Sequence, residues 1–161
     1  MRKARKPKRG RKDDDQSNAR APNQGAAIDC LRCAATPEGI ASWWGPGDGP
    51  VLAAETDPQL GGRFRVLFRM LDGSEHESSG EYLEVVKPER LSMSWRWTGG
   101  AEDPGESLVE IRLRAVAEGT ELTLTHSRLH DEESRRSHEE GWTGALDKLE
   151  RHFLVTERSS P

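Results

Sequence analysis

Three histidines in the last third of the chain have the clearest capacity for acid–base chemistry. His126 follows Leu122 and Leu124 at a spacing of two, so on a strand its imidazole shares their buried face. A buried imidazole needs a hydrogen-bond partner. It either serves as a hydrogen-bonding group or general acid/base toward a ligand in a cavity, or ends the strand and is satisfied by a helix or solvent. His138 precedes Trp142 by four residues, so on a helix it can face the cavity mouth together with His126.

Other chemistry finds little support in the sequence. A metal site from His126, His130 and His138 has no recognised ligand spacing and no carboxylate placed to complete it, so we predict no metal. Cys30 and Cys33 form a Cys-x-x-Cys without a second pair or a histidine at zinc spacing, which favours two reduced thiols. The chain lacks a glycine-rich phosphate loop and the sequence context of a Ser-His-Asp triad. We therefore predict no cofactor and no nucleophile.

Tryptophans form the second group of candidate site residues. Trp95 and Trp97 share the inward face of a predicted strand, where they either line a cavity or pack in the core. Trp43 and Trp44 stand side by side in "IASWWGPGDGP". On a helix they would point about 100° apart. One is therefore expected to plug the open end of the sheet, and the other to rest at the cavity rim.

These residues need strands and helices to position them, and the strands are indicated by a period of two. Five segments alternate in this way: "GGRFRVLFRML", "GEYLEVV", "RLSMSWRWT", "SLVEIRLRAV" and "TELTLTH". The pattern predicts an antiparallel sheet with one buried face. The residues expected on that face include Phe64, Val66, Phe68, Met70, Leu91, Met93, Trp95, Trp97, Val109, Ile111, Leu113, Ala115, Leu122, Leu124 and His126.

Two helices are predicted beside the sheet. In "TPEGIASWWG", Thr36 is a suitable N-cap and Pro37 suits the first helical position, with Gly45 ending the segment. Near the C-terminus Asp131 is the expected cap of a long amphipathic helix. Its apolar positions are Trp142, Ala145, Leu146, Leu149 and Phe153. The predicted architecture is α+β, with a curved antiparallel sheet wrapped around the long C-terminal helix and short helices closing one end.

Charge divides the chain into two parts. Its 161 residues allow one domain, with 24 Lys and Arg against 28 Asp and Glu. The first 20 residues hold nine of the basic residues and only three of the acidic ones, so the remainder is strongly acidic. We expect a basic, disordered tail at 1–26, a domain at 27–157 and a short tail at 158–161. Nucleic acid is not expected as a partner except through the basic tail.

In this order, the segments resemble bacterial relatives of the activator of the ninety-kilodalton heat-shock chaperone's ATPase, within the START-like or SRPBCC superfamily. The resemblance is carried by "TPEGIASWWGP", "GGRFRVLFRMLDGSEHESSGEYLEVVKPERLSMSWRW", "GTELTLTH" and "HEEGWTGALDKLERHF", over about residues 34–154. It implies a helix-grip (START-like, Bet v-like) fold with an apolar cavity between sheet and long helix. The residues expected to line that cavity are Trp43, Trp44, Phe64, Phe68, Met93, Trp95, Trp97, Ile111, Leu124, His126, His138 and Trp142.

The expected function is the binding of a small hydrophobic or amphipathic molecule in that cavity, and we expect a binding module rather than an enzyme. Two alternatives remain open: an enzyme of the cyclase or dehydratase type that uses His126 as acid/base, and a co-chaperone that stimulates a chaperone ATPase. The expected oligomeric state is monomer or homodimer. The sequence has neither a signal peptide nor an apolar run long enough to span a bilayer, so a cytoplasmic location is expected.

The N-terminal part departs from the family pattern. "QSNARAPNQGAAIDCLRCAATPEG" contains the "AP" of the family's opening phrase but no recognisable strand before it. If this chain start is natural, we expect a sheet of six strands or fewer with an exposed edge. A shifted reading frame or an engineered start would explain the basic tail equally well.

Overall fold

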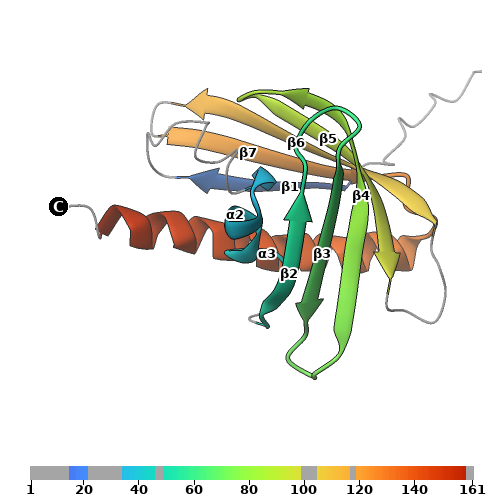
Figure 1. Cartoon of the computed structure of the whole chain (residues 1–161). Coiled ribbons are helices and arrows are strands. Elements are labelled where there is room, and N and C mark those ends of the chain that lie inside the picture. Colours follow the sequence, from blue (N-terminus) through green and yellow to red (C-terminus); the bar gives the residue numbers. More distant parts are fainter. Residues whose placement is uncertain (1–14, 22–33, 46–48, 99–104, 117–118, 159–161) are drawn as a thin grey trace, which may run out of the picture.

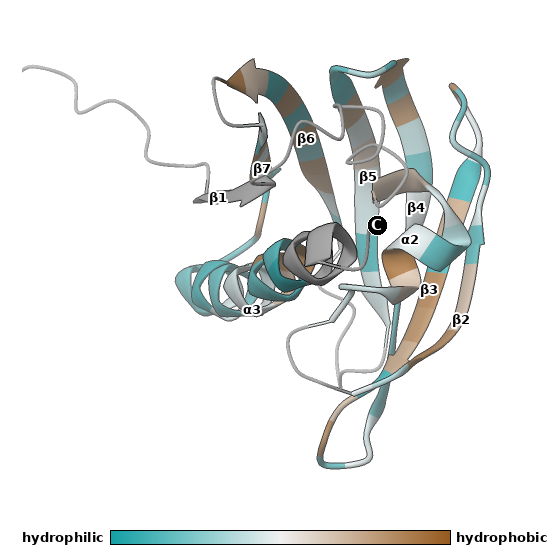
Figure 2. Cartoon of the chain, turned by 90° about the vertical axis from the view of Figure 1, so that its left-hand side faces the viewer, coloured by the Kyte–Doolittle hydropathy of each residue, from teal (hydrophilic) through white to brown (hydrophobic). Residues whose placement is uncertain are grey.

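The fold is a curved antiparallel sheet that wraps around one long helix (Figures 1 and 2). The structure is a computed structural model and describes residues 15–21, 34–45, 49–98, 105–116 and 119–158, the side chains of 15–21 and 152–158 excepted. The basic residues before position 15, Cys30 and Cys33 thus fall outside the description, as does the side chain of Phe153. Labels follow Figure 1. The helix-grip fold expected from the sequence is confirmed.

The described sheet has seven strands in the order β1-β7-β6-β5-β4-β3-β2, each antiparallel to its neighbours. Five of them correspond to the period-two segments. The strands are β1 (Asp15–Ala21), β2 (Val51–Thr56), β3 (Arg63–Arg69), β4 (Glu75–Val86), β5 (Arg90–Thr98), β6 (Glu106–Val116) and β7 (Gly119–Ser127).

β1 corrects two expectations. It pairs with β7 along its whole length, with Asp15 opposite His126 and Ala21 opposite Thr120. The sheet therefore has more than six strands, and β7 is not an edge. β1 also lies before residue 27, where the domain was expected to begin. The segment "DQSNARA" has no alternating apolar residues, so hydrophobic periodicity could not reveal a strand that is defined by backbone pairing.

β2 was missed for a different reason. Its register against β3 shifts between Val51 and Ala53, which interrupts the alternation of inward and outward side chains. Leu52 consequently points to solvent, 39% exposed. A segment with such a bulge does not show a clean period of two.

The short helix α2 (Pro37–Ala41) begins as predicted. The Thr36 side chain accepts a hydrogen bond from the backbone N–H of Gly39 at 3.1 Å, and Pro37 occupies the first turn. The helix ends earlier than Gly45, because the hydroxyl of Ser42 donates to the Gly39 carbonyl at 2.6 Å and the chain turns.

The long helix α3 (Glu132–Arg158) lies across the concave face of the sheet (Figure 2). The backbone N–H of Ser134 donates to Oδ1 of Asp131 at 2.7 Å, so the predicted cap is confirmed. The first buried side chain of α3 is Trp142, and it is followed by Ala145, Leu146 and Leu149. Every described side chain from Asp131 to Gly141 is exposed or half-buried.

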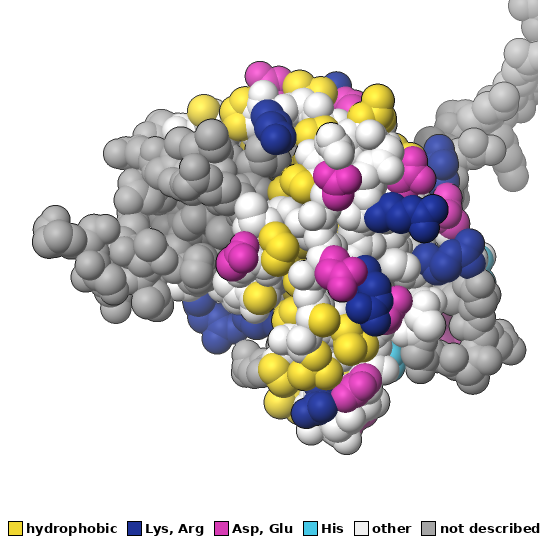
Figure 3. All heavy atoms as spheres, viewed as in Figure 1, with side chains coloured by type: hydrophobic (Ala, Val, Ile, Leu, Met, Phe, Trp, Pro, Cys, Tyr) yellow, Lys and Arg dark blue, Asp and Glu magenta, His cyan; other side chains and the backbone are white. Residues whose placement is uncertain are grey.

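The inward side chains form one hydrophobic core, largely as the alternation predicts. Ala115 is an exception: it is exposed, because it lies near the end of β6 beyond the reach of α3. The outer face carries cross-strand ion pairs, among them Arg65 with Glu77 at 2.7 Å and Arg69 with Glu75 at 2.8 Å. Figure 3 shows Lys and Arg side chains next to Asp and Glu side chains on this face, with exposed apolar side chains among them. No helix in the described ranges is long and apolar enough to cross a membrane.

Candidate functional site

His126 joins three elements of the fold through its two ring nitrogens. It lies on β7 and is 1% exposed, facing inward as predicted. The indole N–H of Trp142 on α3 donates to its Nδ1 at 3.0 Å. Its Nε2 lies 2.7 Å from the hydroxyl oxygen of Ser107 on β6. Of the two interpretations of this histidine, the one satisfied by the helix fits the structure.

The partner of Nδ1 determines where the ring proton sits. An indole N–H can only donate, so Nδ1 of His126 carries a lone pair and the proton is on Nε2. Nε2–H then donates to the Ser107 oxygen. The Ser107 hydroxyl in turn donates to the backbone carbonyl of Trp95, 3.3 Å away. Each donor from Trp142 through His126 to Ser107 therefore has one acceptor.

The surroundings of His126 keep it neutral. Burial and, to a smaller extent, the nearby imidazole of His138 lower the pKa of His126 to about 3. The two ring centroids are 4.7 Å apart. Protonation of Nδ1 would also turn its lone pair into an N–H that faces the N–H of Trp142. His126 is thus an uncharged structural group at physiological pH.

The Ser107 hydroxyl and Nε2 of His126 are as close as a serine nucleophile and its general base, but Nε2 is not in the unprotonated form that a base requires. A serine nucleophile loses its proton to an unprotonated imidazole nitrogen. Here the nitrogen that faces Ser107 already carries the proton, and the lone pair is used by Trp142. The arrangement therefore stabilises the core rather than activating a nucleophile. Sequence reasoning overlooked Ser107, although its spacing of two from Val109 places it on the inward face.

Four tryptophans form a packed cluster beside His126. Ring centroids are 5.3 Å apart for Trp43 and Trp44, 5.5 Å for Trp44 and Trp95, and 5.1 Å for Trp95 and Trp142. These distances are typical of aromatic contact, so the rings fill the space between α2, β5 and α3. The indole N–H of Trp44 donates to the Ser78 hydroxyl at 3.0 Å.

Trp43 and Trp44 do not divide between core and rim as expected. They are 0% and 3% exposed, so both belong to the core. α2 ends at Ala41, yet the backbone N–H of Trp44 still bonds to the Ile40 carbonyl at 3.0 Å, so the two rings can point in different directions. Both are nevertheless buried, because Trp43 contacts Trp142 on α3 and Trp44 contacts Trp95 on β5.

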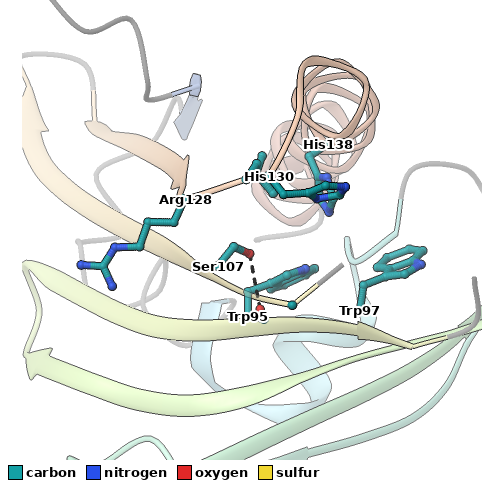
Figure 4. A pocket seen from close by; sticks show the side chains of 8 residues that line it. Trp95, Trp97, Ser107, Arg128, His130 and His138 are labelled. Carbon is teal, nitrogen blue, oxygen red and sulfur yellow. Dashed lines mark hydrogen bonds between the residues drawn. The ribbon is translucent and has the colours of Figure 1, made fainter. Parts of the chain in front are cut away.

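A small hollow lies where β5 and the start of β6 face the first turns of α3. Its space for the centre of a water molecule is about 10 Å³, which is room for about one water. In Figure 4 Trp95 and Trp97 lie on one side of it and His130 and His138 on the other, while the guanidinium of Arg128 points away from both histidines. The lining residues are Trp95, Trp97, Gly105, Ser107, Arg128, Leu129, His130 and His138.

One polar atom in this wall is unusual. The indole N–H of Trp95 is buried and has no hydrogen-bond partner in the part of the chain that the structure describes. A buried donor without an acceptor costs about 1–3 kcal/mol. In Figure 4 the Trp95 ring extends from its strand toward the space beneath His138. The hollow therefore borders a donor that a bound acceptor would satisfy.

Trp97 is the other aromatic wall of the hollow. The His76 ring stacks on it at 5.1 Å between centroids, and His138 meets it edge-on at 6.1 Å. His76 was not among the predicted site residues. It shares the inward parity of Ser78 and Tyr82 on β4, but the polar sequence around it gave no apolar alternation.

Of the predicted cavity residues, Trp95, Trp97 and His138 line the hollow. The remainder are buried in the packed core, and a role for them in ligand binding stays a prediction: Trp43, Trp44, Phe64, Phe68, Met93, Ile111, Leu124, His126 and Trp142. Within the described residues, no three His, Cys, Asp or Glu side chains are grouped so as to hold a metal ion. His130 instead contacts Asp131 at 2.8 Å.

The family model for "Activator of Hsp90 ATPase homolog 1-like protein" matches residues 32–153, which is most of the chain. The chain belongs to this family. The match extends from just before α2 into α3 and includes every residue that lines the hollow. The fold and the sequence thus agree on an Activator of Hsp90 ATPase homolog 1-like domain, and the resemblance inferred from the motifs is confirmed.

Several solved structures have the same fold. The AHSA1 protein from Silicibacter pomeroyi is 25% identical, with a TM-score of 0.77 over 89% of this chain and 99% of that one. A protein from Chromobacterium violaceum is 21% identical, with a TM-score of 0.73 over 86% and 95%. The AHSA1-like protein from Aeromonas hydrophila is 20% identical, with a TM-score of 0.70 over 89% and 94%. Among curated proteins, none matches this chain.

Proposed function

We propose that this domain binds a small amphipathic molecule in the hollow between β5 and the first half of α3. The observation that carries the proposal is the buried, unpartnered N–H of Trp95 beside an aromatic-lined space. Ligand sites combine apolar walls with a few polar groups that fix orientation. Trp95 and Trp97 supply the walls, and the Trp95 indole supplies the polar group.

The hollow is too small to hold a ligand without a change in the structure. About 10 Å³ is far below the roughly 300 Å³ of an ordinary ligand pocket. A ligand larger than water therefore requires an outward shift of the first turns of α3. Those turns have no buried described side chain before Trp142, so few apolar contacts oppose the shift.

The enzymatic alternative gains no support from His126. Both of its nitrogens are occupied by Trp142 and Ser107, and its low pKa keeps it neutral. It is therefore poorly suited to donate or accept a proton from a ligand. The co-chaperone alternative is supported by the description of the family alone. Saturable stimulation of a purified chaperone's ATPase would be needed to establish it, and a flat titration would reject it.

The experiment is an NMR screen of small aromatic and amphipathic compounds against ¹⁵N-labelled protein. We expect hits to shift the indole signals of Trp95 and Trp97 and the amide of His138 before other signals. Trp97→Leu should weaken binding of a hit at least threefold. Leu83→Ala, on the exposed outer face, is the matched control and should leave binding unchanged. A screen without hits, or hits that shift only signals of the outer face, would reject the proposal.

A further inference from the structure

We infer that the ligand class of this hollow is a small planar molecule that carries a hydrogen-bond acceptor, with a carboxylate as the preferred acceptor. The inference rests on the proposed function and deepens it. The ligand class follows from the hydrogen-bond donors in the lining. The rest of the domain, in contrast, is rich in carboxylates.

The polar side chains of the lining are rich in donors. Trp95, Trp97 and Arg128 can only donate hydrogen bonds. His138 already donates from Nδ1 to the Ser134 carbonyl at 2.7 Å, and Nε2 of His130 contacts Asp131 at 2.8 Å, so the indole N–H groups are the donors that a ligand can meet. No Asp or Glu is among the described residues that line the hollow. A wall of this kind matches a carbonyl or carboxylate oxygen and disfavours a ligand ammonium group.

This donor-rich lining stands out because the chain beyond its first 20 residues has 15 basic against 25 acidic residues. Exposed carboxylates lie near it, among them Asp131, Glu132 and Glu133 at the start of α3. The described lining, which has no carboxylate, differs from this surface. The acidic surroundings would repel anions at long range, so an anion that binds here must be held by short-range hydrogen bonds.

The Trp95 N–H is the donor expected to hold that acceptor. It already bears the cost of burial without a partner, so a ligand oxygen that reaches it gains a hydrogen bond without breaking one. The planar shape follows from the two tryptophan faces, since flat rings offer offset stacking to a flat ligand. Arg128 lies at the hollow with φ of 62°, a backbone conformation uncommon for residues other than glycine. In Figure 4 its guanidinium points away from the two histidines, so its positive charge would act on a bound carboxylate from a distance and not through a hydrogen bond.

Four probes of nearly equal size separate these features: benzoate, benzamide, toluene and benzylamine. Binding to the full chain is followed by the indole N–H signal of Trp95 and by titration calorimetry. We expect benzoate to bind most tightly, benzamide more weakly, and toluene at least tenfold more weakly than benzoate. Benzylamine should not bind. The Trp95 indole signal should shift downfield with benzoate, as expected for a hydrogen bond to an oxygen.

Two variants test the donor itself. Trp95→Phe keeps an aromatic ring and removes the N–H, and should weaken benzoate binding about tenfold, corresponding to about 1.4 kcal/mol. Trp44→Phe is the matched control: it also removes one indole N–H from the buried cluster but does not line the hollow. It should leave benzoate affinity within twofold. Arg128→Gln should weaken benzoate about threefold and leave benzamide unchanged.

The outcomes separate the two proposals. If toluene binds as tightly as benzoate, or Trp95→Phe leaves benzoate affinity unchanged, the acceptor class is wrong while the proposed apolar site stands. If none of the four probes binds, both proposals are overturned. Should Trp95→Phe unfold, the downfield shift of the Trp95 signal in the unaltered protein decides: its absence at saturating benzoate overturns the inference.

Discussion

Nε1 of Trp142 lies 3.0 Å from Nδ1 of His126, and this contact connects the long helix to the centre of the sheet. Because the indole can only donate, it holds His126 in the tautomer with the proton on Nε2. In that tautomer Nε2–H donates a hydrogen bond to Ser107, so Nε2 cannot accept the proton of the Ser107 hydroxyl. One contact between helix and strand thus decides both the packing and the chemistry of this histidine.

The free energy of unfolding should fall as the pH drops below about 6.5. Burial lowers the pKa of His126 in the folded protein to about 3, from an ordinary value of 6.5. Between these values the unfolded chain binds a proton that the folded protein does not. The contribution of neutral His126 to the free energy of unfolding is therefore complete above pH 6.5. Below that pH the free energy of unfolding falls by up to about 1.4 kcal/mol per pH unit. Urea unfolding at several pH values from 7.5 to 5 measures this slope.

Two variants serve as controls for that slope. His126→Gln removes the buried titrating group and should flatten the profile, even if the variant is less stable throughout. His130→Gln alters an exposed position and should retain the slope of the unaltered protein. A free energy of unfolding that stays constant from pH 7.5 to 5 would contradict the assignment of His126 as a buried neutral group.

Ser107→Ala should destabilise the fold by about 1–3 kcal/mol, since it leaves the Nε2–H of His126 buried without an acceptor. Ser137→Ala is the comparison. Ser137 is exposed on α3, where alanine has the higher helix propensity, so stability should stay equal or rise slightly. Chemical denaturation of both variants gives the difference. Equal stabilities would show that the Ser107 hydroxyl is dispensable.

Gly80→Ala should destabilise the protein by about 3 kcal/mol or more. A Cβ at this position would lie 1.8 Å from the backbone carbonyl oxygen of Ser94 and 2.8 Å from the Phe64 ring. Backbone on the neighbouring strand cannot move aside as a flexible side chain can. Gly105→Ala meets no atom of the described residues within 4 Å, and its positive φ should cost only about 1–2 kcal/mol. Thermal unfolding that ranks the two variants in the opposite order would refute the close approach of β4 and β5.

Arg128→Gly should leave stability unchanged or raise it by up to about 1 kcal/mol. At φ of 62° an arginine bears a steric cost that glycine does not, while glycine loses more backbone entropy on folding. The side chain is exposed, so little packing is lost. Arg128→Ala keeps the steric cost and provides the comparison by thermal melting. A glycine variant less stable than the alanine variant would argue against strain at this position.

Most strands of the sheet were predictable because one face of the sheet is buried in the core and the other faces solvent. β5 matches the predicted segment "RLSMSWRWT" residue for residue, since Leu91, Met93 and Trp95 alternate with polar residues on the opposite face, although Ser92 and Ser94 there are themselves only 7% exposed. β1 and β2 escaped the same reasoning. In β1 the strand is held by backbone pairing without an apolar pattern, and in β2 the bulge breaks the alternation.

The sequence by itself determined which face the five alternating strands bury, where both helices begin, and that His126, Trp95 and Trp97 point inward. Periodicity and capping are local, so they can be recognised without knowing what lies opposite. Only the tertiary structure decided that Trp142 and Ser107 occupy both nitrogens of His126, while the Trp95 N–H has no partner among the described residues. Those outcomes depend on contacts between residues far apart in the chain. Whether a hydrogen bond forms depends on differences of a few tenths of an ångström in the distance between two atoms, and the spacing of residues in the sequence does not encode such differences.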